Sequence, residues 1–122
     1  MKTNEEKYQE IFTKAYLGLA SQGFEKSLKS NMNDICMYKG LAGRRCAIGH
    51  VIPDDMYCEE LEGLGATAPS VLKVVWPDAN SDERLFLEEL QRSHDYSGPN
   101  TNMEILLQAF AEKYNLQIPA TL

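Results

Sequence analysis

Residues 35–48 read ICMYKGLAGRRCAI, two short apolar stretches on either side of the polar segment KGLAGR. Gly40 and Gly43 lie in that segment, and glycine readily adopts the positive φ angles that tight chain reversals require. Apolar stretches of this length around such a segment are typical of a β-hairpin. We therefore expect residues 35–38 to pair with residues 45–48. Because an isolated hairpin is only marginally stable, it should pack against helices.

Helical spacing of apolar residues governs most of the remaining chain. The first helix is expected to begin at Thr3, which starts a capping box, and to bury a face rich in aromatic residues. Further helices are predicted over residues 53–62 and 69–76, and after the capping residues Ser81 and Thr101.

Length and composition describe one globular domain. The chain has 122 residues, of which 43% are hydrophobic and 9% aromatic, and this apolar content is enough to stabilise an ordered core. We predict a single domain over residues 1–122 of the α+β class. It should be mainly helical, with a two-stranded β-hairpin packed on about four to five helices. Trp76, which ends the apolar stretch VLKVVW, is expected in the core.

The charge distribution points to a protein partner. A net charge of −6 argues against direct binding of nucleic acid, which needs clustered Lys and Arg. Residues 24–46 nevertheless carry a net charge of +3, whereas residues 53–64 carry five acids and no Lys or Arg. Such a dipolar surface steers the approach of a protein partner. The predicted partner-binding residues are Asp54, Asp55, Glu59, Glu60 and Glu62.

The absence of membrane and secretion signals in the sequence bears on where the protein is located in the cell. No stretch approaches the roughly 20 apolar residues of a membrane-spanning helix, and the first residues, MKTNEEKYQE, do not have the pattern of a signal peptide. The three cysteines, Cys36, Cys46 and Cys58, do not have the spacing of a disulfide framework, which favours reduced thiols. We expect a cytoplasmic protein that does not associate with membranes.

A zinc site is one interpretation of the cysteines and histidines. Cys46 and His50 are four residues apart, so their side chains share a face of either a helix or a strand. With Cys36 and either Cys58 or His94, they would supply the four ligands of a tetrahedral zinc ion. The spacing lacks the close cysteine pair of common zinc motifs, and free cysteines usually pack as small hydrophobic residues. Core packing is therefore favoured, with a zinc site at Cys36, Cys46, His50 and His94 as the alternative.

A thiol enzyme is a further alternative. Cys46 would be the nucleophile, His50 or His94 would accept its proton, and Asp95 would orient the histidine. Such a triad can be written into many sequences, and the glycine-containing segment EGLGATAPS lacks the features of a phosphate-binding loop. We therefore assign no catalytic residue and favour a binding protein over an enzyme.

Three motifs carry a resemblance to known proteins: C-x-Y at residues 36–38, GRRCAIGHVIPD at residues 43–54 and LQxxHD at residues 90–95. Together they resemble a pattern found in small bacterial and phage proteins, which implies a bacterial or phage setting. By analogy, small acidic proteins in such settings block or redirect host proteins. The resemblance thus favours an inhibitor of a host nuclease or defence component that acts through residues 53–62. The alternatives are a zinc-stabilised module and a hydrolase or transferase that uses Cys46.

Overall fold

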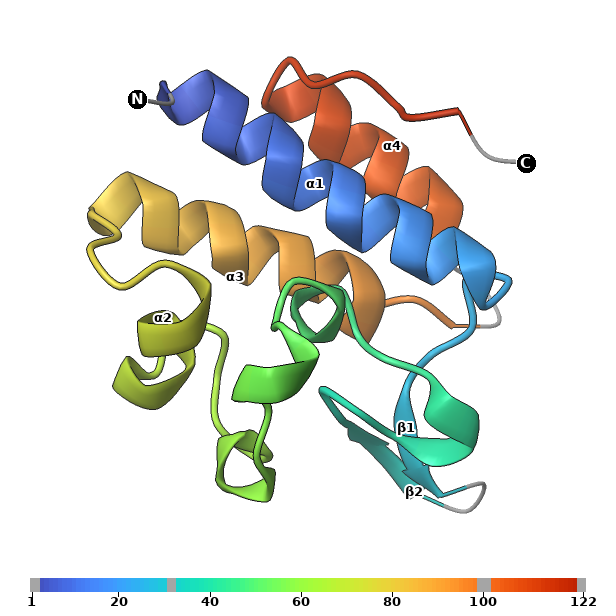
Figure 1. The fold of residues 1–122 in the computed structure, drawn as a ribbon. Coiled ribbons are helices and arrows are strands. Elements are labelled where there is room, and N and C mark those ends of the chain that lie inside the picture. The colour runs from blue at the N-terminus through green and yellow to red at the C-terminus, as the bar shows by residue number, and fades with distance from the viewer. Residues whose placement is uncertain (1–2, 31–32, 99–101, 121–122) are drawn as a thin grey trace.

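The computed structural model describes residues 3–30, 33–98 and 102–120, and in these ranges the chain is mostly helical (Figure 1). The helices and strands are α1 (Asn4–Ser21), β1 (Leu28–Ser30), β2 (Asn33–Cys36), α2 (Pro69–Val75), α3 (Ser81–Asp95) and α4 (Met103–Lys113). The single-turn 3₁₀ helices between β2 and α2 are η1 (Leu41–Gly43), η2 (Ile48–His50), η3 (Asp54–Met56) and η4 (Glu59–Leu61). Helix α3 packs against α4, and η2 packs against both α1 and α3. In the described ranges no helix is both long and apolar enough to cross a membrane.

Aromatic side chains from the three long helices form the centre of the core. The ring of Tyr8 in α1 stacks on that of Phe86 in α3, with 4.0 Å between the ring centroids. Phe86 also contacts the rings of Phe110 and Tyr114, at the carboxyl end of α4. Trp76 is buried and meets Tyr8 edge-on, so the prediction that Trp76 lies in the core is confirmed.

The helix starts follow local capping rules. Thr3 caps α1 as predicted, because its Oγ1 accepts the Glu6 N–H at 3.1 Å. The cap of α3 is Asn80 rather than the predicted Ser81, since the Asn80 side chain accepts the Glu83 N–H at 2.9 Å. The predicted cap Thr101 lies outside the described residues, and Asn102 caps α4.

The predicted hairpin of residues 35–48 is wrong, and with it the α+β fold class. The β structure of the described chain is limited to β1 and β2, two short antiparallel strands with an irregular register. Residues 45–48 belong to no strand. The fold is therefore mostly helical, and the strands lie at one end of the molecule in Figure 1.

The backbone of Arg45 pairs with a side chain instead of with the expected strand. Gln22, just after α1, accepts the Arg45 N–H at 3.0 Å through Oε1 and donates from Nε2 to the Arg45 carbonyl at 2.7 Å. The chain then turns into η2, where the Gly49 N–H donates to the Cys46 sulfur at 3.3 Å. The apolar residues that follow Arg45 are thus buried by a 3₁₀ turn and not by a strand.

The predicted helix over residues 53–62 is also wrong. The segment forms two separate 3₁₀ turns, η3 and η4, because Tyr57 and Cys58 between them have extended backbone angles. The predicted helix over residues 69–76 is confirmed as α2, which has Pro69 in its first turn.

Candidate functional site

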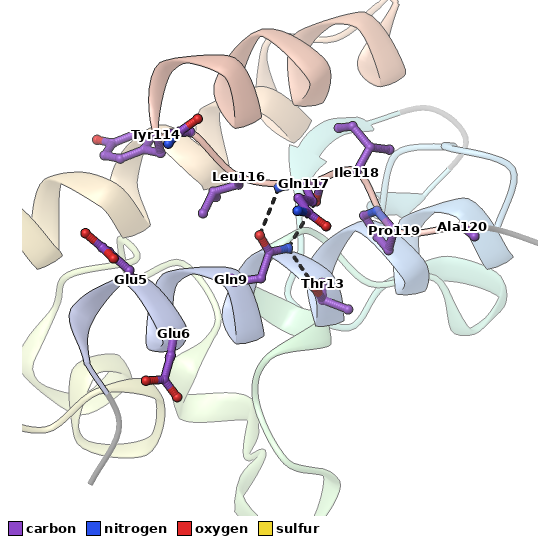
Figure 2. A pocket seen from close by; sticks show the side chains of 11 residues that line it. Glu5, Glu6, Gln9, Thr13, Tyr114, Leu116, Gln117, Ile118, Pro119 and Ala120 are labelled. Atoms are coloured by element: carbon purple, nitrogen blue, oxygen red, sulfur yellow. Dashed lines mark hydrogen bonds between the residues drawn. The ribbon is translucent and has the colours of Figure 1, made fainter.

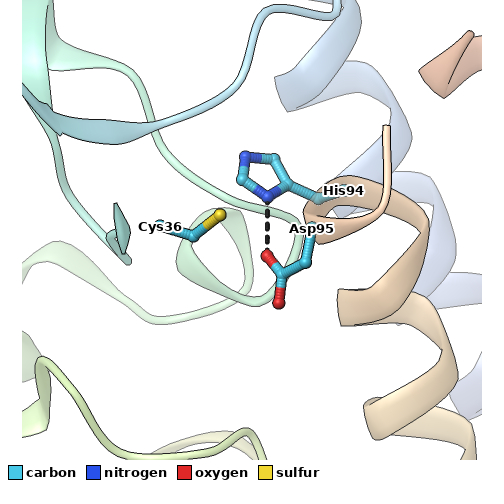
Figure 3. A group of neighbouring side chains, drawn as sticks. All are labelled: Cys36, His94 and Asp95. Carbon is cyan, nitrogen blue, oxygen red and sulfur yellow. Dashed lines mark hydrogen bonds and ion pairs between the residues drawn. The ribbon is translucent and has the colours of Figure 1, made fainter. Parts of the chain in front are cut away.

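The structure brings together two of the four predicted zinc ligands and adds a carboxylate. The ligand atoms of Cys36, His94 and Asp95 lie within 4.8 Å of one another (Figure 3). Cys36 ends β2, and the other two residues end α3. Cys46 and His50, also predicted as ligands, are not part of this group in the described chain.

Hydrogen bonds determine where the proton of His94 lies. Its Nε2 accepts the Ser27 N–H at 2.9 Å, and a backbone N–H can only donate, so the proton of the neutral ring is on Nδ1. Nδ1 donates to Asp95 Oδ1 at 2.9 Å. A metal bound at Nδ1 would place a proton on Nε2, pointing at the Ser27 N–H. The residues present therefore do not fit a zinc ion in this arrangement.

Asp95 connects α3 to the segments packed on it. Gln91 donates from Nε2 to Asp95 Oδ1 at 2.8 Å and accepts the Ile48 N–H through Oε1 at 3.0 Å. Burial alone would raise the pKa of Asp95, but hydrogen bonds from His94, Gln91 and Cys36 outweigh it and hold that pKa below its ordinary value. The carboxylate is therefore charged at neutral pH.

His50 has a structural position against α1. Its Nε2 lies 2.9 Å from Gln22 Oε1 and donates to that carbonyl oxygen. The ring packs against Gly18, where any side chain would collide with it. Burial, together with the positive charge of Arg45, lowers the pKa of His50 to about 4. The ring is thus neutral at neutral pH and is held by packing.

Cys46 does not have the environment of a nucleophile. Its side chain is fully buried, and burial raises the pKa of the thiol well above its ordinary value. A reactive cysteine needs a lowered thiol pKa and a nearby base, yet His50 is bonded to Gln22. Cys58, the third cysteine, is exposed on the surface.

Four of the five predicted partner-binding acids lie on the surface. Asp54 and Asp55 belong to η3, Glu59 and Glu60 belong to η4, and all four are exposed. Asp54 pairs with the guanidinium of Arg45. In the described chain no ion pair joins the other three to a cation.

Glu62, the fifth acid, holds the segment in place. Its carboxylate accepts the N–H groups of Tyr38 and Lys39 at 2.8 and 3.1 Å and the Tyr57 hydroxyl at 2.7 Å. Burial and this hydrogen bond raise the pKa of Tyr57 to about 12, so the hydroxyl keeps its proton and remains a donor. The Tyr38 hydroxyl in turn donates to the Leu64 carbonyl at 2.6 Å.

A pocket of about 290 Å³ opens beside this segment. It is lined by residues 36–38, residues 63–65, Cys46, and Gln91 and Asp95 of α3. Sequence reasoning did not assign a role to Gln91, although the LQxxHD motif contains a usable signal. Residues four apart lie on the same face of a helix, so this spacing predicts that the side chains of Gln91 and Asp95 are neighbours.

A second pocket, of about 770 Å³, lies between the first half of α1 and the residues that follow α4 (Figure 2). Gln9 accepts the Gln117 N–H at 2.9 Å and donates to the Gln117 carbonyl at 3.0 Å. These two hydrogen bonds hold the last described residues against α1. Among the described residues that line this pocket, the carboxylates are those of Glu5 and Glu6, which lie in the exposed first turn of α1.

Comparison with protein-family models, curated proteins and solved structures finds no match for this chain. The resemblance to small bacterial and phage proteins therefore stays a prediction from the motifs. The features that bear on function are the acidic segment, residues 53–62, and the pocket of about 290 Å³ beside it.

Proposed function

We propose that the protein binds a basic surface of a partner protein through residues 53–62. The observation that carries this proposal is the position of Asp55, Glu59 and Glu60. These exposed carboxylates lie on a segment without α-helix or strand, which is nevertheless held in place by Glu62. Ordered irregular segments of this kind commonly serve in binding.

The contacts of Glu62 reduce the cost of binding. A segment that is already ordered loses less conformational entropy when a partner docks. Met56 and Leu64, 45% and 40% exposed, add apolar surface among the acids. Interfaces typically combine apolar contacts with a polar rim.

The net charge of −6 extends the attraction beyond the segment itself. An acidic surface complements the basic groove of a protein that binds nucleic acid, and charge complementarity speeds association and selects partners. We therefore propose a nuclease or another nucleic-acid-binding defence component as the partner class, met in the bacterial cytoplasm.

Charge reversal tests the proposal. The protein and two double variants, E59K/E60K and the control D78K/E112K, are used to capture partners from a bacterial lysate at low and high salt. Both variants change the net charge equally, but Asp78 and Glu112 are exposed positions outside the acidic segment. We expect E59K/E60K to weaken binding of the captured protein about 10- to 100-fold and to reduce its salt dependence.

Thermal unfolding of both variants shows whether they are folded. If E59K/E60K is folded and binds the same partner as tightly as the control variant does, residues 53–62 are not the interface.

A further inference from the structure

The pocket beside the acidic segment, residues 53–62, has a carboxylate in its wall. Among the described residues that line it, Asp95 alone has a side chain charged at neutral pH. Its hydrogen-bond donors are His94 Nδ1, Gln91 Nε2 and the Cys36 thiol. Lys26 is nearby, but it donates to the Asp95 backbone carbonyl, at 2.9 Å. No Lys or Arg side chain is among the described residues that line the pocket.

From this arrangement we infer that the pocket takes an arginine side chain of the partner, with its guanidinium on Asp95. The inference rests on the proposed function, since the acidic segment would bring the partner to the pocket. Gly63, Leu64 and Gly65 follow Glu62 directly in the chain and line the pocket. A partner docked on Glu59 and Glu60 therefore lies next to the pocket mouth.

The carboxylate of Asp95 is accessible from the pocket. Its side chain is 34% exposed. Figure 3 shows one carboxylate oxygen directed at the His94 ring and the other pointing away from it. The first oxygen accepts from both His94 and Gln91, and the Cys36 thiol is a further donor to the carboxylate. Because a carboxylate oxygen can accept more than one hydrogen bond, the oxygen that points away from the ring is placed to meet a cation.

The walls of the pocket suit the stem of a long side chain. Met37 and Leu64 are apolar, and Tyr38 is fixed by the bond from its hydroxyl to the Leu64 carbonyl and by the bond from its N–H to Glu62. Arginine buries its methylene groups against apolar surface and keeps its charged end at a polar group. A volume of about 290 Å³ is small for a separate ligand and sufficient for one side chain.

Arginine fits this pocket better than lysine does. A guanidinium is more weakly hydrated than an ammonium, so it loses less on entering a half-buried site. Its planar set of donors can bind a carboxylate through two parallel hydrogen bonds, whereas an ammonium acts as a point charge.

The test uses a small probe, N-acetyl-arginine amide, followed by NMR. Its neutral isostere, N-acetyl-citrulline amide, has the same shape without the charge. We expect the arginine probe at millimolar concentration to shift the amide signals of Gly63, Gly65 and Gln91. The citrulline probe should leave them unchanged.

Two variants, G65F and D95N, test where the probe binds, and G98F serves as a control. In G65F the new ring enters open space, since a Cβ at Gly65 meets no atom within 4 Å, and it should block the pocket and abolish the shifts. G98F is the matched control, because Gly98 is equally open and lies outside this pocket. In D95N the Asn carbonyl still accepts from His94 and Gln91, so the fold is kept while binding weakens about tenfold or more.

The outcomes separate this inference from the proposed function. Equal shifts with both probes, no shifts in the folded protein, or shifts that persist in G65F would each overturn the arginine pocket. Arginine-specific shifts that G65F removes and E59K/E60K retains support the pocket. If E59K/E60K then leaves partner capture unchanged, only the proposal for the acidic segment fails.

Discussion

Replacing Gly18 with alanine should destabilise the protein, although Gly18 lies inside α1. A Cβ at this position would lie 2.8 Å from His50 Cδ2 and closer still to Cγ and Nδ1, whereas ordinary Cβ contacts begin at 3.4 Å. The ring would have to move by about 1 Å, which overpacks the site and breaks its hydrogen bond to Gln22.

The expected loss of stability is the sum of two costs and one gain. Overpacking costs about 1–3 kcal/mol, and the lost hydrogen bond costs about 1 kcal/mol. Alanine gains about 1 kcal/mol over glycine in a helix interior. G18A should therefore lower the free energy of unfolding by about 1–3 kcal/mol.

A double-mutant cycle measured by urea unfolding checks this reasoning. In the H50A background the collision is absent, so G18A should stabilise the protein by about 1 kcal/mol. The coupling between the two positions is then about 2–4 kcal/mol. G65A, at an open position, serves as a control that should change stability little. If G18A has the same effect with and without His50, the collision does not determine stability.

Three further predictions concern His50, Glu62 and the group formed by Cys36, His94 and Asp95. Because the pKa of His50 falls from 6.5 to about 4 on folding, the unfolded chain binds more protons between these values. The free energy of unfolding should therefore decrease as pH falls through this window, by about 1–2 kcal/mol after solvent screening, and urea titrations of H50Q should lack this decrease. E62Q should destabilise the protein by about 1–3 kcal/mol and speed hydrogen exchange of the Tyr38 and Lys39 amides; unchanged exchange would show that Glu62 does not hold them. Native mass spectrometry before and after chelation should give one metal-free mass, and a zinc ion lost together with the fold would contradict the proton assignment at His94.

Local signals in the sequence predicted the long helices well, although not the helix over residues 53–62. The cap at Thr3 and the helical spacing after it depend on residues within a few positions of one another, and α1 forms as expected. At α3 two adjacent residues could serve as the cap, and Asn80 is used because its carbonyl oxygen reaches the Glu83 N–H.

Long-range side-chain bonds explain why the hairpin was predicted wrongly. The short apolar stretch at residues 45–48 fits a buried strand and a buried 3₁₀ turn equally well. The outcome depends on Gln22, distant in sequence, whose amide pairs with the backbone of Arg45. No periodicity in the sequence reports such a contact.

The candidate site was predictable in part for the same reason. His94 and Asp95 are neighbours in the chain, and the sequence already grouped His94 with Cys36. The direction of the His94 hydrogen bonds depends on the backbone N–H of Ser27, a contact made only in the folded chain. That contact is what argues against zinc.

Gln22, just after α1, and Gln91 in α3 bond the backbone of the segment between β2 and α2, and Glu62 joins distant parts of that segment to one another. Because much of this segment is held by a few side-chain hydrogen bonds, we expect its exposed parts to open more readily than the helices do. Residues between the anchors can therefore be exchanged during evolution while the helical framework is preserved. A chain built in this way can change the partner it recognises without changing its fold.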